Sequence, residues 1–160
     1  MNTQAHIVSR TNDSFILQIE VPLYSNILQA EESIQKALNT GGVEATREVM
    51  KQHDTDGSPI MMCGQKLTSK GLKNKEVQTP YGPLNVERHV YQSNKGGAIF
   101  APMDNACKFV HTSTPKFAKM ITSKYSCDAA PGVQRDLQDN HHRSIALSYI
   151  KKVTDYVGTI

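Results

Sequence analysis

Hydrophobic and polar residues alternate in the first patterned stretch of the chain. The apolar members of this stretch are Phe15, Leu17, Ile19 and Val21. Because successive side chains of a strand point to opposite faces, a period of two predicts a strand over residues 14–21. Pro22 ends the strand, since proline has no N–H group to donate to a sheet.

The apolar spacing then changes to the period of a helix. Residues that share one helical face are Ile27, Leu28, Ile34, Ala37 and Leu38. They predict a helix from about Ser25 that ends at Gly41, a residue that commonly follows helices. We expect a second helix over residues 42–53 and then a turn in the sequence DTDGSP. We interpret this first segment as a packing or self-association module, so a homodimer is a candidate assembly.

A second alternating stretch predicts strands in the middle of the chain. After a turn at residues 80–83, one face of the next strand carries Leu84, Val86, Arg88 and Val90, and the other carries Asn85, Glu87, His89 and Tyr91. Residues 75–79 are its expected hairpin partner, and SNKGG predicts a further turn. This segment is therefore predicted to be a small β-meander.

His89 lies beside Glu87 and Arg88, which raises the question of a catalytic cluster. No nucleophile or second acid is placed nearby in the sequence, as catalysis would require. We therefore interpret these residues as a solvent-facing row with ion pairs across strands.

Helical spacing returns in the last third of the chain. Thr114 and Pro115 fit the N-cap and the first position of a helix. A second helix starts near Asp128, and a third starts at Ser144 after a polar turn over residues 139–143. The apolar face of this third helix is formed by Ala146, Tyr149, Ile150, Val153 and Val157. Three short helices with tight turns predict a tri-helical unit of the helix-turn-helix type.

These patterns together predict the α+β fold class. We expect an N-terminal segment with a strand and helices over residues 1–56 and a β-meander over residues 57–107. A helix-turn-helix-like unit should cover residues 108–160.

Composition and the N-terminal sequence bear on whether the protein is secreted or spans a membrane. Hydrophobic residues make up 38% of the 160 residues, there is no Trp, and no run of about 18 apolar residues occurs. The N-terminal sequence MNTQAHIVSRTND lacks the apolar stretch that a signal peptide contains. We therefore expect a cytoplasmic protein without a membrane partner.

The cysteines argue against a metal site. Cys63, Cys107 and Cys127 are scattered singly, whereas zinc sites usually draw on close pairs of ligands. We expect neither a disulfide framework nor a metal or other cofactor.

Charge is distributed unevenly along the chain. Residues 1–56 carry 4 Lys/Arg and 8 Asp/Glu, residues 57–107 carry 6 and 3, and residues 108–160 carry 8 and 4. The basic excess in the last two segments indicates an anionic partner, for which nucleic acid is the commonest candidate. A merely solvated surface is the alternative.

In a helix-turn-helix unit, the helix after the turn enters the major groove of DNA. We expect Arg143 to pair with guanine or to bind a phosphate, and Lys151 to bind a phosphate. The candidate DNA-binding residues are Arg135, His142, Arg143, Ser144, Ser148, Lys151 and Lys152. An ordinary helical hairpin also has a polar, solvated face, so the residues alone leave both interpretations open.

Several stretches resemble one protein family. They are DTDGSPI, KLTSKG, TPYGPLNVERHVYQSNKGG, TSTPKFAKMITSKYS and VQRDLQDNHHRSIALSYI. Together they resemble the N-terminal region of bacterial insertion-sequence transposases of the ISKra-four group, from about Phe15 to the last residue. The resemblance implies DNA binding at element ends through this region. It also implies a later RNase-H-like domain whose acidic residues hold two metal ions for DNA cleavage.

The chain departs from that family at three points. It stops at Ile160, before the catalytic domain, and none of its acidic residues can be matched to a catalytic position. Some relatives have metal-binding cysteine pairs in the β region, where this chain has Cys63 alone. The doublet His141-His142 occupies a turn in which relatives are expected to have a glycine.

We therefore expect a transposase-derived fragment that binds element-end double-stranded DNA and is not an enzyme by itself. The alternative is a domesticated, stand-alone regulator or inhibitor on the same domain, which binds DNA or a nucleic-acid-binding protein.

Overall fold

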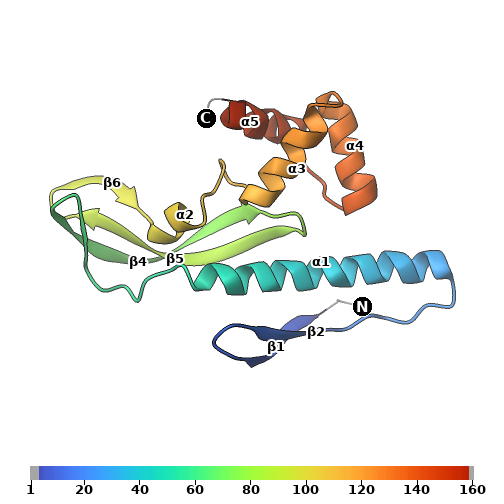
Figure 1. Cartoon of the computed structure of the whole chain (residues 1–160), viewed down its shortest axis with the longest axis horizontal. Helices are drawn as coiled ribbons and strands as arrows, with labels where there is room; N and C mark the ends of the chain where they lie inside the picture. Colours follow the sequence, from blue (N-terminus) through green and yellow to red (C-terminus); the bar gives the residue numbers. More distant parts are fainter. Residues whose placement is uncertain (1–3, 159–160) are drawn as a thin grey trace.

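The computed structural model describes residues 4–158, and its fold is mixed α+β, as the sequence predicts. Figure 1 shows a long helix between an N-terminal hairpin on one side and the C-terminal helices on the other. In chain order the elements are β1 (Ala5–Arg10), β2 (Phe15–Ile19), α1 (Ile27–Lys51), β3 (Ile60–Met62), β4 (Gln65–Gln78), β5 (Pro83–Ser93), β6 (Gly96–Phe100), α2 (Pro102–Ala106), α3 (Pro115–Tyr125), α4 (Ala130–His141) and α5 (Leu147–Gly158).

The predicted first strand is confirmed as β2, and it has a partner that the sequence pattern did not indicate. β1 pairs antiparallel with β2, with Ala5 opposite Ile19 and Arg10 opposite Phe15. The register shifts between Ile7 and Ser9. That irregularity interrupts the alternation from which β1 would otherwise have been predicted.

The prediction of two helices separated at Gly41 is wrong, because α1 is one continuous helix of 25 residues. Gly41 and Gly42 lie within it, where close neighbours leave no room for a side chain. A Cβ atom on Gly41 would come within 2.9 Å of Ile19 Cγ2, and one on Gly42 within 2.3 Å of Tyr81 Cγ. The glycines let the hairpin and the β4–β5 turn approach the helix closely, which outweighs their poor helix propensity.

The central segment is the predicted meander, an antiparallel sheet in the order β3-β4-β5-β6. The hairpin partner of β5 extends well beyond residues 75–79, since β4 begins at Gln65. The apolar face of β5 is confirmed, with Leu84, Val86 and Val90 buried.

The other face of β5 is less open to solvent than predicted. Tyr91 is 0% exposed, and its hydroxyl bonds Thr55 Oγ1 at 2.6 Å and the carbonyl oxygen of Ser58 at 3.0 Å. The segment after α1 therefore covers this end of the sheet. Its aspartate Asp54 accepts hydrogen bonds from the backbone N–H of His89 and lies 3.0 Å from His89 Nδ1.

Two hydrophobic clusters hold the described residues together. One joins α1, the sheet and α2 through Met50, Val77, Leu84, Val86 and Met103. The other lies among the C-terminal helices and contains Phe117, Ala118, Ile121, Ala130, Val133, Leu137, Ile145, Ile150 and Val153. The first cluster draws on both the N-terminal and central segments, so the contacts between these segments are part of the core.

Candidate nucleic-acid interface

The three C-terminal helices share one core, as a tri-helical unit requires. From α5, Ile150 and Val153 are buried in that core. The opposite side of α5 carries Ser148, Lys151, Lys152 and Asp155, all exposed. These residues lie at helical spacings of three, four and seven, so they form one polar face.

The helix boundaries around the turn differ from the prediction. α4 continues through His141, and α5 begins at Leu147 rather than at Ser144. Ser144 is exposed in the connecting segment and lies outside the polar face of α5. Gln134 of α4 holds this connector, because its Nε2 donates a 2.8 Å hydrogen bond to the carbonyl oxygen of Ile145.

α4 ends at His142, which adopts a left-handed conformation with φ 52° and ψ 36°. The next residue, Arg143, donates its backbone N–H to the carbonyl oxygen of Leu137 at 2.8 Å. This geometry is the common end of a helix at which glycine is preferred, because a Cβ atom is crowded in this conformation. The chain therefore makes the turn with a non-glycine residue.

Arg143 does not lie where a DNA-binding role requires it. Only 4% of the surface of Arg143 is exposed to solvent. Its Nε donates to the carbonyl oxygen of Thr79 at 3.0 Å, and its NH2 group donates to Gln78 Oε1 at 2.5 Å. The guanidinium also lies over the Phe117 ring, 5.2 Å from the centroid. The interpretation of Arg143 as a base or phosphate contact needs correcting, because its hydrogen-bonding groups are directed into the protein.

Arg143 instead connects the C-terminal helices to the β4–β5 turn. Burial lowers its pKa from the ordinary value, and nearby Tyr149 acts in the opposite direction. Tyr149 belongs to the same junction, since its hydroxyl lies 2.6 Å from Ser113 Oγ. Backbone hydrogen bonds of Gln78 with Thr112 and Thr114 complete the junction.

Thr114 occupies the predicted N-cap position of α3, but its side chain makes no capping hydrogen bond. Its backbone N–H instead donates to the carbonyl oxygen of Gln78 at 2.9 Å. The attachment to β4 therefore determines how the chain enters α3.

The remaining candidate residues are accessible. Arg135 on α4, His142 in the turn, and Ser148, Lys151 and Lys152 on α5 are exposed. The structure adds Lys116 and Lys119, which are exposed on α3. These two lysines were not among the candidates proposed from the sequence.

Lys124 is less available than the lysines of α5, because it forms an ion pair with Asp136 of α4. Hydrogen bonds from Lys124 and Asn140 lower the pKa of Asp136. The neighbouring His141 has a lowered pKa, first because it is partly buried and then because of Lys124, while Asp136 opposes the shift.

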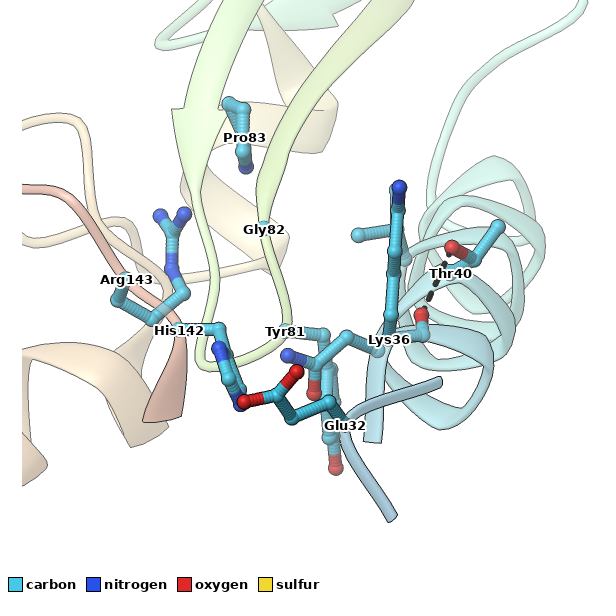
Figure 2. A pocket seen from close by; sticks show the side chains of 10 residues that line it. Glu32, Lys36, Thr40, Tyr81, Gly82, Pro83, His142 and Arg143 are labelled. Atoms are coloured by element: carbon cyan, nitrogen blue, oxygen red, sulfur yellow. Dashed lines mark hydrogen bonds between the residues drawn. The ribbon is translucent and has the colours of Figure 1, made fainter. Parts of the chain in front are cut away.

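A cleft of about 630 Å³ lies beside the turn. Figure 2 shows Glu32 and Lys36 of α1 on one side of it and His142 and Arg143 on the other. Asn39 of α1 donates a 3.3 Å hydrogen bond to the carbonyl oxygen of His141 at this level. The cleft therefore marks the place where α1 meets the C-terminal helices.

The residues around His89 have separate partners in the structure. His89 pairs with Asp54, whereas Arg88 Nε donates to Asp104 Oδ1 at 2.7 Å. Lys75 also donates to Asp104, at 2.8 Å. These contacts connect the sheet to the segment after α1 and to α2, so the expected ion pairs across strands need correcting.

Within residues 4–158, no group of three or more His, Cys, Asp or Glu side chains is placed to hold a metal ion. Over the same residues, none of the helices combines the length and apolar character needed to span a bilayer.

No protein-family model, curated protein or solved structure matches the chain.

Proposed function

We propose that the chain is a DNA-binding module of the transposase type, which binds element-end duplex DNA through α5 without cleaving it. The main support is the outward face of α5, where Ser148, Lys151 and Lys152 are exposed on a helix that follows a short connector, residues 142–146. A recognition helix needs this combination of a buried apolar face and an accessible polar face. A cytoplasmic location goes with this proposal, because that is where a bacterial DNA partner lies.

The roles within this face follow from side-chain chemistry. Lys151 and Lys152 are point charges on flexible stems and suit phosphate oxygens. Ser148 lies near the start of α5, the part of a recognition helix that meets base edges. Arg135 and His142 flank the face and suit further phosphate contacts.

Fluorescence anisotropy with labelled element-end duplex, measured across a series of salt concentrations, tests the proposal. We expect the double variant Lys151→Ala, Lys152→Ala to bind less tightly. Its plot of log affinity against log salt should have a slope lower by about 2, since each phosphate contact contributes about one unit. Lys95→Ala makes the same kind of change in the β5–β6 turn, away from the helices, and should leave binding unchanged.

Two results would count against the proposal. One is that the folded chain has no salt-dependent affinity for duplex DNA. The other is that the double variant binds as tightly as the parent chain, which would exclude α5 as the contact. Tight binding to a nucleic-acid-binding protein without DNA affinity would instead support the stand-alone regulator.

A further inference from the structure

The N-terminal part of α1 and the residues before it carry large apolar side chains that their own chain leaves uncovered. We call residues 23–34 the arm. Its exposed large apolar residues, with exposed fractions of 98%, 49%, 74%, 62% and 44%, are Leu23, Tyr24, Ile27, Leu28 and Ile34. From residue 27 to residue 36 the helix has no buried residue. A helical extension of about ten residues is marginal without packing, so the arm needs a partner to cover it.

Five apolar side chains of α1 form one stripe along its length. Its members are Ile27, Ile34, Leu38, Ala45 and Val49, with spacings of seven and four residues. The N-terminal hairpin packs on a neighbouring face, where Ala37 and Gly41 are buried. The stripe adjoins the surface that the hairpin covers, because Val49 lines a pocket together with residues 10–15 of the hairpin turn. Leu38 at its centre is nevertheless 53% exposed.

The two halves of the stripe have complementary shapes. Large side chains protrude from the arm, whereas the C-terminal half borders a groove of about 470 Å³. Its lining is mainly apolar and includes Ala45, Val49, Met50, Tyr81, Ala106 and Pro115.

The charged residues of the arm and those at the edge of the groove are also complementary. Glu31 is exposed on the arm, between Ile27 and Ile34. No acidic residue lines the groove, and its edge carries His53 and, next to Pro115, the exposed Lys116. If the arm of another copy occupied this groove, Glu31 would lie among lining residues that carry no negative charge.

We propose that α1 is a self-association surface on which two copies of this chain pair antiparallel around a two-fold axis near Leu38. The two ends of the stripe are equidistant from this residue, because Ile27 and Val49 each lie eleven positions from it. Between the ends, Ile34 would lie opposite Gly42 of the other copy, and Ala45 opposite Glu31. In such a pair, each arm lies in the groove of the other copy. A two-fold interface requires a surface that is complementary to itself, which the stripe provides.

Sedimentation velocity of the full chain over a concentration series tests the association. We expect a concentration-dependent dimer. Leu38→Glu should raise the dissociation constant at least tenfold, because it places two carboxylates together at the axis. Ile34→Ser is a second, milder variant that should also weaken the dimer if Leu38→Glu fails to fold. Ile16→Glu is the matched control, since Ile16 is 61% exposed on β2 and outside the stripe.

Cross-linking tests the antiparallel orientation in a background that lacks the three native cysteines. Under mild oxidation, Leu38→Cys should give a covalent dimer. Ile27→Cys and Val49→Cys should cross-link when mixed, whereas each alone should not. Cross-linking of Ile27→Cys with itself would instead show a parallel pair and overturn the arrangement.

A chain that stays monomeric at every concentration would overturn the proposal, as would a dimer that neither Leu38→Glu nor Ile34→Ser weakens. In those cases another partner or another segment covers the arm. The outcome does not depend on DNA binding, because both measurements use the protein alone.

Discussion

Arg143 and Phe117 lie against each other, with the guanidinium carbon 5.2 Å from the centroid of the aromatic ring. The same guanidinium donates to the carbonyl oxygen of Thr79, so one side chain connects α3, the α4–α5 connector and the β4–β5 turn. This position makes Arg143 a determinant of stability.

We expect Arg143→Ala to lower the free energy of unfolding by about 2–4 kcal/mol, since it leaves buried acceptors unpaired and removes packing against Phe117. Arg143→Lys should recover only part of this loss, because an ammonium group lacks the planar fork of donors. Urea denaturation followed by circular dichroism provides the measurement. Lys152→Ala, which removes an exposed cation of α5, should change stability by less than about 0.5 kcal/mol. Equal stability of the two alanine variants would contradict the structural role.

His142→Gly should stabilise the protein by about 1 kcal/mol, because glycine adopts the left-handed conformation without a Cβ clash. His142→Val should destabilise it, since a β-branched residue fits this conformation poorly. Thermal melts of both variants beside the parent chain test the pair of expectations. A lower melting temperature for His142→Gly would mean that the imidazole makes a compensating contact in the cleft.

Gly42→Ala should destabilise the protein despite the better helix propensity of alanine. Overpacking against Tyr81 costs about 1–3 kcal/mol, whereas the propensity gain is about 1 kcal/mol. In a Tyr81→Ala background the same change should become neutral or stabilising, which a double-mutant cycle measures. Gly158→Ala is the control, because a Cβ atom there meets nothing within 4 Å. An unchanged effect in the Tyr81→Ala background would exclude the contact as the cause.

The ion pairs of Asp104 predict a component of acid sensitivity. Burial by itself would raise the pKa of Asp104, but hydrogen bonds from Arg88 and Lys75 outweigh it and lower the pKa. A lowered pKa in the folded state contributes stability above the pKa of the unfolded state, and this stability is lost as the pH falls through the folded value. Asp104→Asn should therefore flatten the dependence of unfolding free energy on pH below about pH 4. Asp139→Asn, on the exposed side of α4, serves as the charge-matched control, and identical pH profiles for Asp104→Asn and the parent would contradict the assignment.

Local patterns were sufficient where an element exposes one face and buries the other. The alternation of β5 and the spacing in the last helix correctly indicated Leu84, Val86, Ile150 and Val153 as core residues. The same patterns gave no reliable signal at boundaries. Gly41 was interpreted as a helix end because glycine commonly follows helices. The residues that make glycine favourable inside the helix, Leu17 and Ile19 of the hairpin, are distant in the sequence.

The candidate DNA-binding site was also predicted only in part from the sequence. Its polar residues on α5 follow from helical spacing, so Ser148, Lys151 and Lys152 could be proposed from the sequence alone. Arg143 could not be assigned correctly, because the groups that bury it belong to the β4–β5 turn, 64 residues earlier for Thr79. An arginine beside a polar turn has the same local sequence whether it faces solvent or a carbonyl oxygen.

The sequence by itself determined the α+β class, the order of the main segments and much of the buried faces of β5 and α5, because these depend on periodicity within a few residues. Ala146 and Val157, predicted on the apolar face of the last helix, are exposed. Only the tertiary structure decided that α1 is continuous, that Arg143 is internal and that the arm of α1 is uncovered. Those properties depend on which distant segments meet, and the free energy of such contacts outweighs the local preferences of a single glycine or arginine.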